Sequence, residues 1–282
     1  MFKWPKRGDD VSSESESFRD IGDLTGQVAV ISGSTSGIGL AMARAIASRG
    51  GDVVLNGLGD PSEIERTRAE MEASCGVRVR YHAANMMRGD EVADMVAYGK
   101  HELGRVDILI NNAGVQHVEA VEKFPADKWE QIIAINLSST FYATRAAIPI
   151  MKAQGRGRIV NIASAHGLVA SPFKSAYVAA KHGVLGFTKT VALEVARDGI
   201  TCNAICPGYV ETPLVQSQIA DQARARGISK EKVVEDVILA AQPTKQFVTT
   251  DQLVGMMLYL VSDLGASANG ASFSIDGGWT AQ

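Results

Sequence analysis

Short apolar runs that alternate with helical patterns constrain the fold of this chain more than any other feature. The runs are rich in β-branched and aliphatic residues, and stretches with helical periodicity separate them from Gln27 onward. Such runs are typical of strands that helices cover on both faces. The pattern predicts a single α/β domain, a doubly wound (Rossmann) parallel sheet of about seven strands with helices on both faces. The expected strands are Val28 to Ser32, Asp52 to Asn56, Arg78 to His82, Val106 to Asn111, Arg158 to Ala163, Ile200 to Ile205 and Ser272 to Ile275.

The remaining segments divide the chain into a tail, one domain and an insertion. Residues 1–23 begin with a basic segment and continue with many Ser, Glu and Asp residues, which predicts a disordered or loosely attached tail. Residues 24–282 are expected to form the single domain, because no internal repeat or second domain is visible. Residues 212–243 have a polar helical pattern that predicts a small helical lid over a ligand or, alternatively, a surface helical excursion.

Charge, hydropathy and cysteine use narrow the classes of protein to consider. The 282 residues carry a formal net charge of −3, which gives no reason to expect a nucleic acid or an anionic membrane as partner. No apolar stretch approaches the roughly 20 residues that span a bilayer, and no apolar segment follows the basic start as in a secretory signal. Cys75, Cys202 and Cys206 lack zinc-like spacing, so we expect reduced thiols and no metal site. We therefore expect a soluble, cytoplasmic protein.

A glycine-rich segment follows the first expected strand and precedes a helical pattern. Its glycines are Gly33, Gly37 and Gly39, and the apolar-periodic segment from Ile38 follows without a gap. This context suits a dinucleotide, because glycines allow a tight turn and close backbone approach while the helix N-terminus faces the pyrophosphate. An ordinary strand-to-helix turn is the alternative interpretation.

A tyrosine and a lysine one helical turn apart indicate proton transfer. Tyr177 and Lys181 share a helix face because residues i and i+4 do so, and Ser164 precedes Tyr177 by thirteen positions. A free phenol has a pKa of about 10, so a nearby positive charge is needed to stabilise the phenolate near pH 7. The arrangement predicts an alcohol dehydrogenase in which Tyr177 is the acid/base. A surface helix with a chance Tyr and Lys is the alternative when the pair is taken alone.

These motifs together resemble the short-chain dehydrogenase/reductase family, from about Leu24 to the C-terminus. The motifs occur in the family's order: the glycine segment, Asn111-Asn112-Ala113-Gly114, Asn136, Ser164, Tyr177 with Lys181, and Pro207-Gly208 with Thr212. The resemblance implies that Ser164 binds the substrate oxygen, that Lys181 lowers the pKa of Tyr177 and holds the nicotinamide ribose, and that Asn136 completes a proton relay through water. It also implies cofactor contacts from Gly33, Thr35, Ser36, Gly37, Ile38, Gly39, Leu58, Asn85, Met86, Asn112, Gly114, Tyr177, Lys181, Pro207, Gly208, Val210 and Thr212.

The end of the second expected strand bears on the choice of cofactor. An acidic residue there binds the adenosine ribose hydroxyls, whereas a basic residue pairs with a 2′-phosphate. The segment runs from Asn56 to Asp60 without Lys or Arg, and Ser34 to Ser36 contain none. We therefore expect NAD rather than NADP. Asn85 stands where the family usually has Asp, which predicts a change in cofactor affinity rather than a loss of binding.

Polar residues around the catalytic motifs indicate the substrate class. A lysine, a histidine and two amides in one pocket would hold a small carboxylate by charge-assisted hydrogen bonds. The segments around Ser164, Pro207 and the closing Asp276-Gly277-Gly278-Trp279 resemble the bacterial D-3-hydroxybutyrate dehydrogenases within the family. That resemblance implies oxidation of D-3-hydroxybutyrate to acetoacetate. It also implies substrate contacts from Gln116, Ser164, His166, Lys174, Tyr177, Gln218 and Trp279, the last in its own chain or from a neighbouring subunit, and altered stacking at Tyr209, where Trp is expected.

Other interpretations stay open at this point. The same core would serve a reductase of a 3-oxoacyl thioester or a sugar, and each polar residue taken singly could satisfy only a loop or solvent. A non-catalytic NAD-binding regulatory protein is a further alternative, although Ser164, Tyr177 and Lys181 are all present. The family resemblance also implies a homotetramer.

Overall fold

The structure is a computed structural model that describes residues 22–212, 215, 219, 223 and 227–281. The tail predicted for residues 1–23 lies outside the described residues, except for its last two positions. Gln218, predicted to bind substrate, also lies outside them.

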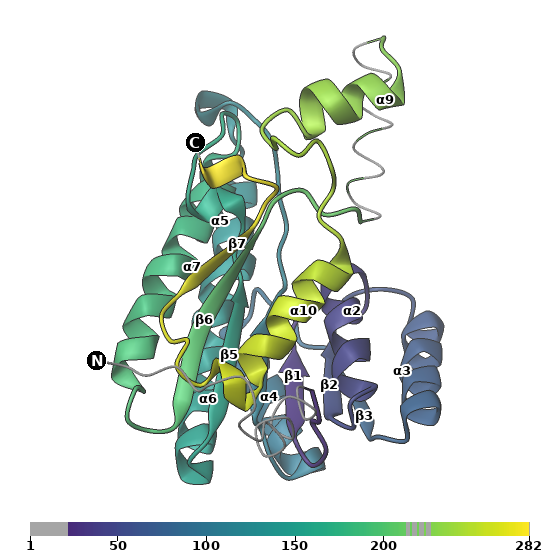
Figure 1. Cartoon of the computed structure of the whole chain (residues 1–282), viewed down its shortest axis with the longest axis vertical. Helices are drawn as coiled ribbons and strands as arrows, with labels where there is room; N and C mark the ends of the chain where they lie inside the picture. The colour runs from purple at the N-terminus through teal and green to yellow at the C-terminus, as the bar shows by residue number, and fades with distance from the viewer. Residues whose placement is uncertain (1–21, 213–214, 216–218, 220–222, 224–226, 282) are drawn as a thin grey trace, which may run out of the picture.

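A parallel sheet of seven strands, in the order β3-β2-β1-β4-β5-β6-β7, forms the centre of the fold (Figure 1). This confirms the predicted doubly wound sheet. Two strand boundaries differ from the prediction by two residues, and four others differ by one. Val106 precedes β4 because its backbone N–H and C=O both bond to the side chain of Gln154, and β6 continues to Pro207 because it pairs with β7. The strands are β1 (Val28–Ile31), β2 (Asp52–Asn56), β3 (Val79–His82), β4 (Ile108–Asn111), β5 (Gly157–Ile162), β6 (Ile200–Pro207) and β7 (Ser272–Ile275).

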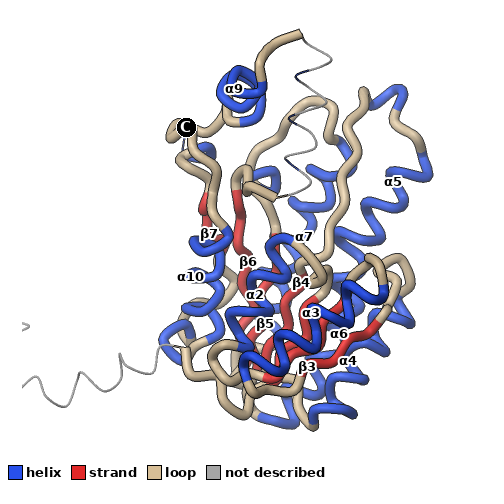
Figure 2. The backbone as a smooth tube through the Cα atoms, turned by 90° about the vertical axis from the view of Figure 1, so that its right-hand side faces the viewer, coloured by secondary structure: helices blue, strands red, loops and turns tan. Residues whose placement is uncertain are grey.

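Helices cover both faces of this sheet (Figures 1 and 2). One face is covered by apolar side chains that include Met42, Ile46, Leu253 and Met257. The other face is covered by the helices that follow β3, β4 and β5. Among the described residues, no helix is both long and apolar enough to cross a membrane. The first layer contains α2 (Gly37–Ala47), α3 (Pro61–Cys75) and α10 (Thr250–Val261), and the second contains α4 (Gly89–Leu103), α6 (Ser139–Gln154) and α7 (Ser175–Glu194).

The strand order reverses between β1 and β4, and this reversal positions the site. The chain leaves β1 toward β2 and β3 and then returns to place β4 on the other side of β1. The loops that follow β1 and β4 therefore diverge at the carboxyl edge of the sheet. In open α/β sheets, ligands bind in the crevice that such a switch point creates.

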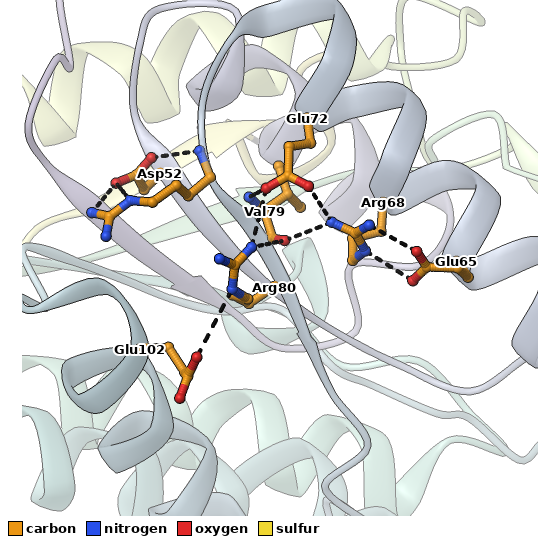
Figure 3. Close-up of polar contacts among 8 residues, drawn as sticks. Asp52, Glu65, Arg68, Glu72, Val79, Arg80 and Glu102 are labelled. Carbon is orange, nitrogen blue, oxygen red and sulfur yellow. Dashed lines mark hydrogen bonds and ion pairs between the residues drawn. The ribbon is translucent and has the colours of Figure 1, made fainter.

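An ion-pair network covers the edge strand β3 (Figure 3). Glu72 of α3 accepts hydrogen bonds from Arg68 at 2.5 Å, from Arg80 at 3.1 Å and from the Val79 backbone N–H at 3.2 Å. Arg80 also lies 4.0 Å from Glu102 of α4. Charged side chains of this kind keep an exposed sheet edge from pairing with another chain, and here they also connect both flanking helices to the edge.

We expect Glu72→Gln to lower the free energy of unfolding at neutral pH by about 1 kcal/mol, because the carboxylate joins three donors. The Arg68 hydrogen bond, followed by the Val79 N–H, holds the pKa of Glu72 below its ordinary value of 4.5. The carboxylate therefore stabilises the fold above that value and loses the effect as the pH falls through the lower folded pKa. Urea unfolding at neutral and acidic pH measures both effects. Glu70→Gln is the control, since Glu70 is exposed and its contact with Arg66, at 3.8 Å, is long for an ion pair. An equal loss of unfolding free energy in both variants would contradict the prediction.

The described part of the 212–243 segment has a small apolar core of its own. It contains α9 (Lys230–Val233) and the π-helical turn Val234–Ile238. Ile219, Val233, Ile238 and Leu239 are buried, and Tyr209 packs beside them. Figure 1 shows α9 beyond the carboxyl ends of the strands. The described part of the segment therefore lies beside the carboxyl edge of the sheet, and closure over a ligand stays a prediction.

Candidate active site

A cleft of about 530 Å³ opens at the switch point, along the carboxyl edge of the sheet. Its size falls in the range of small-molecule and cofactor sites. The loops after β1, β2, β4, β5 and β6 all contribute lining residues, as does the C-terminal turn. Of the residues predicted to bind cofactor or substrate, those that line it are Gly33, Thr35, Ser36, Gly37, Ile38, Leu58, Asn85, Met86, Asn112, Gly114, Gln116, Ser164, His166, Lys174, Tyr177, Lys181, Pro207, Gly208, Val210, Thr212 and Trp279.

The glycine turn after β1 brings the N-terminus of α2 to the cleft. Gly33 has φ +62°, and a Cβ there would lie 2.9 Å from the Ala113 Cα. A Cβ on Gly39 would lie 2.4 Å from the Gly33 carbonyl oxygen, so Gly39 packs the turn and does not line the cleft. Ser36, the N-cap of α2, makes no side-chain capping bond, and the first turn carries no acidic residue. The first N–H groups of α2 are therefore suited to bind an anion.

The loop after β2 forms the far end of the cleft. Asn56 is buried and holds the loops together: its amide donates to the His82 and Ala84 carbonyls, each at 3.0 Å, and accepts from the Gly33 N–H at 3.2 Å. Asp60 instead caps α3 by accepting from the Ser62 N–H at 2.9 Å. Asp60 does not line the cleft. An Asp-Pro-Ser-Glu sequence is a signature of a helix start, and it accounts for this placement.

Ser164, Tyr177 and Lys181 meet in the middle of the cleft. Ser164 follows β5 and accepts a hydrogen bond from the His166 N–H at 3.1 Å. A hydrogen bond from Ser164 lowers the pKa of Tyr177, but burial has the larger effect and raises that pKa above its ordinary value. The Lys181 ammonium lies 5.6 Å from the centre of the Tyr177 ring and donates to the Ile162 carbonyl at 2.7 Å. Burial lowers the pKa of Lys181 to about 8, so the group is still mostly charged at neutral pH.

The effect of Lys181 on the pKa of Tyr177 stays a prediction. Burial of the phenol outweighs the Ser164 hydrogen bond, so the net direction of the Tyr177 pKa is upward. The Lys181 ammonium itself donates to the Ile162 carbonyl at the end of β5.

Asn136 lies in a π-helical turn, Ala134–Ser138, between α5 (Ala126–Ile133) and α6. Its side chain is buried; its Oδ1 accepts from the Val115 N–H and its Nδ2 donates to the Val115 carbonyl, each at 2.9 Å. Ile135 of this turn lines the cleft, and Asn136 does not. The side chain therefore fixes the loop after β4, and a role in a proton relay stays a prediction.

A second polar group forms the other end of the cleft. The Lys174 ammonium lies 3.1 Å from Nε2 of His166 and 3.1 Å from the hydroxyl of Tyr209. The ring of Trp279 contacts His166 edge-on with centres 4.8 Å apart, and stacks on Tyr209 with centres 5.6 Å apart. Trp279 thus reaches the cleft within its own chain. Gln116 lines the same cleft from the loop after β4.

Comparison with known proteins agrees with this geometry. The family model described as short chain dehydrogenase matches residues 27–223. The chain belongs to the short-chain dehydrogenase family. It is 58% identical over 256 residues to the D-beta-hydroxybutyrate dehydrogenase of Rhizobium meliloti, covering 91% of this chain and 99% of that protein. It is 50% identical over 260 residues to the D-beta-hydroxybutyrate dehydrogenase of Cupriavidus necator, covering 92% and 100%. A solved structure from Sinorhizobium meliloti, provisionally described as a short-chain alcohol dehydrogenase, has a TM-score of 0.82 at 30% identity and covers 93% of this chain and 99% of its own.

Membership of the short-chain dehydrogenase family implies a nicotinamide cofactor, and the cleft fits one. The glycine turn packs closely against the loop after β4, since a Cβ on Gly33 would collide with Ala113, and the uncapped start of α2 suits a pyrophosphate. Lys174 and Lys181 are the only basic lining residues other than His166 among the described positions, and both lie at the Tyr177 end. Residues that would hold the cofactor are therefore Gly33 to Ile38, Asn112 and Lys181, in agreement with the family motifs.

The structure adds lining residues that the sequence analysis missed. Most of them line the cleft with backbone or apolar atoms next to a predicted residue, and such contacts leave no recognisable side-chain pattern in the sequence. Tyr209 differs, because the sequence predicts only altered stacking there, whereas its hydroxyl contacts Lys174. The missed residues are Asn56, Gly57, Ala84, Ala113, Val115, Ile135, Ile162, Ala163, Tyr209 and Val215.

His166 should make the stability of this dehydrogenase depend on pH. Burial and then the Lys174 charge lower the pKa of His166 from 6.5 to about 4. Between these values the unfolded chain binds more protons, so the free energy of unfolding should rise with pH, by about 3 kcal/mol over the window. His166→Gln keeps an acceptor for Lys174 and removes the titration. Urea unfolding of both proteins at several pH values tests this, and an equal rise in the variant would exclude His166 as the cause.

Proposed function

We propose that this chain oxidises D-3-hydroxybutyrate to acetoacetate with NAD⁺, reversibly. The observation that carries the proposal is that a lysine ammonium, held by His166 and Tyr209, lies in the same cleft as Ser164 and Tyr177. An alcohol with a carboxylate two carbons from its hydroxyl-bearing carbon would engage both groups at once. The names of the two relatives at 58% and 50% identity support the same substrate.

The catalytic end of the cleft accounts for proton transfer. The nicotinamide, when bound, supplies the hydride acceptor. Tyr177 takes the hydroxyl proton of the substrate in oxidation and returns it in reduction, and Ser164 donates a hydrogen bond that favours the phenolate. The positive charge of Lys181, 5.6 Å from the ring centre, acts in the same direction. Since burial raises the pKa of Tyr177, the neutral phenol needed for reduction is the more easily formed state.

The carboxylate end accounts for orientation. His166 is neutral at pH 7, because its pKa is lowered to about 4, so its Nε2 can accept from Lys174. The ammonium is then directed into the cleft, where a charge-assisted bond to the carboxylate fixes one face of the reacting carbon. Gln116 and Trp279 border the same space. Gln218 stays a predicted contact outside the described residues.

The adenosine end of the cleft supports NAD over NADP. Within the described part of the chain, the lining beside Asn56, Gly57 and Leu58 contains no Lys or Arg, so a 2′-phosphate would lack a cationic partner there. The homotetramer and the cytoplasmic location remain parts of this proposal that rest on the family resemblance and on the composition.

Initial rates of NADH formation from purified protein test the proposal. D- and L-3-hydroxybutyrate are each supplied with NAD⁺ and with NADP⁺. We expect rapid turnover of the D isomer with NAD⁺ alone. Turnover of a 3-oxoacyl thioester or a sugar, with none of 3-hydroxybutyrate, would contradict the substrate and retain the chemistry. Absence of turnover with every pair would favour a binding protein.

A further inference from the structure

Tyr209 lies directly after β6, and the segment that returns from residues 242–248 fixes its backbone. The Tyr209 N–H donates to Oε1 of Gln242, and its carbonyl accepts from the Val248 N–H at 2.9 Å. Gln242 is fully buried, and its Nε2 donates to the Gln246 carbonyl at 2.7 Å. The Tyr209 backbone is therefore held on both sides.

The ring of Tyr209 is fixed as well. It stacks on Trp279 with an angle of 6° between the ring planes. Trp279 lies in a turn organised by Asp276, which accepts from the Gly278 and Thr280 N–H groups, each at 3.0 Å. The hydroxyl of Tyr209 is thus brought to Lys174 by two rigid supports.

The direction of the Lys174 contact leaves a donor unused. An ammonium has no lone pair, so Lys174 donates and the phenol oxygen of Tyr209 accepts, at 3.1 Å. The O–H of Tyr209 remains a donor, and among the described residues it has no acceptor. Two of the three N–H groups of Lys174 are engaged by Tyr209 and His166, which leaves one. Tyr209 is also close enough to Tyr177 to influence it electrostatically.

We infer that Tyr209 is a further substrate-binding residue, whose O–H donates to the substrate carboxylate beside the remaining N–H of Lys174. A carboxylate accepts at about four lone-pair positions, so it can satisfy both donors together. This inference rests on the proposed function and adds to it a contact that the resemblance to other dehydrogenases did not imply.

Tyr209→Phe keeps the ring on Trp279 and removes the hydroxyl. The KM for D-3-hydroxybutyrate should rise about 10-fold with kcat within about 3-fold of wild type, as expected for one charge-assisted hydrogen bond. Tyr259→Phe, which removes a hydroxyl from α10 outside the cleft, is the matched control and should leave KM unchanged. A KM for Tyr209→Phe equal to that of wild type would overturn the inference.

The same substitution made in a Lys174→Met protein separates a direct contact of Tyr209 with the substrate from an effect through Lys174. If Tyr209 contacts the carboxylate, Tyr209→Phe should still raise KM at least about 3-fold in that protein. If Tyr209 only positions Lys174, Tyr209→Phe should leave the KM of that protein unchanged, and the inference is then wrong. Butyrate, which has the carboxylate without the hydroxyl, gives a readout without turnover. Its Kd, measured by calorimetry with NADH present, should weaken about 10-fold in Tyr209→Phe.

These readouts also separate the inference from the proposed function. A wild-type protein that oxidises D-3-hydroxybutyrate, with Tyr209→Phe unchanged, refutes only the inference. A wild-type protein that binds butyrate without oxidising D-3-hydroxybutyrate refutes the proposed substrate, and the butyrate Kd of the variant still decides on Tyr209. A wild-type protein that does neither refutes both.

Discussion

Tyr177→Phe is expected to lower kcat for D-3-hydroxybutyrate by about 1,000-fold, the middle to upper part of the range for a positioned acid/base. The phenol is the group that Ser164 contacts and that Lys181 faces in the cleft. The ring packs beside Ile132, Ala176 and Ala180, and phenylalanine keeps that packing. Steady-state rates of NADH formation measure the loss, and the Kd for NADH should change less than about 2-fold.

Two further measurements make this result specific. Tyr142→Phe, on α6 and away from the cleft, should have a kcat like that of wild type. Retained NADH binding shows that the variant is folded and that the lost step is chemical. A Tyr177→Phe protein with more than about a tenth of the wild-type kcat would exclude the phenol as the acid/base.

Lys174→Met is expected to raise the KM for D-3-hydroxybutyrate up to about 100-fold, with a smaller effect on kcat. Methionine keeps the unbranched side chain and removes the charge, so the carboxylate loses a charge-assisted bond. His166 and Tyr209 lose their shared partner as well, since each lies 3.1 Å from the ammonium. Substrate-saturation curves with NAD⁺ at a fixed saturating level separate KM from kcat.

An exposed lysine on α7, the helix whose N-cap is Lys174, provides the control. Lys189→Met removes one charge from α7 outside the cleft and should leave KM unchanged. If Lys174→Met retained the wild-type KM, the carboxylate would have to be bound elsewhere in the cleft. Comparison with a secondary alcohol that lacks a carboxylate provides a second check, because its kcat/KM should be the same in both proteins.

The fold was predictable because its signals are local. Each strand is a short apolar run, and a parallel order with helices between strands follows from the alternation. The glycine turn was predictable for the same reason, since Gly33, whose φ is positive, follows β1 closely in the chain. The pairing of Tyr177 with Lys181 follows from helical spacing alone.

The contacts that the sequence did not reveal join residues far apart in the chain. Asn136 bonds to Val115 across 21 positions, and Lys174 reaches Tyr209 across 35. No periodicity encodes such pairs. The direction of the Tyr177 pKa was also beyond prediction, because it depends mainly on how deeply the fold buries the phenol.

The two ends of the cleft come from different halves of the gene product. The turns after β1, β2 and β4 that would hold the adenosine and pyrophosphate precede residue 115, whereas Ser164, His166, Lys174, Tyr209 and Trp279 all follow β5. A crossover between related genes within β5 would therefore exchange most of the carboxylate-facing wall, together with Lys181, and leave the adenosine and pyrophosphate turns intact. Descent by such exchange, or protein engineering that imitates it, could retarget the alcohol without redesigning cofactor selection.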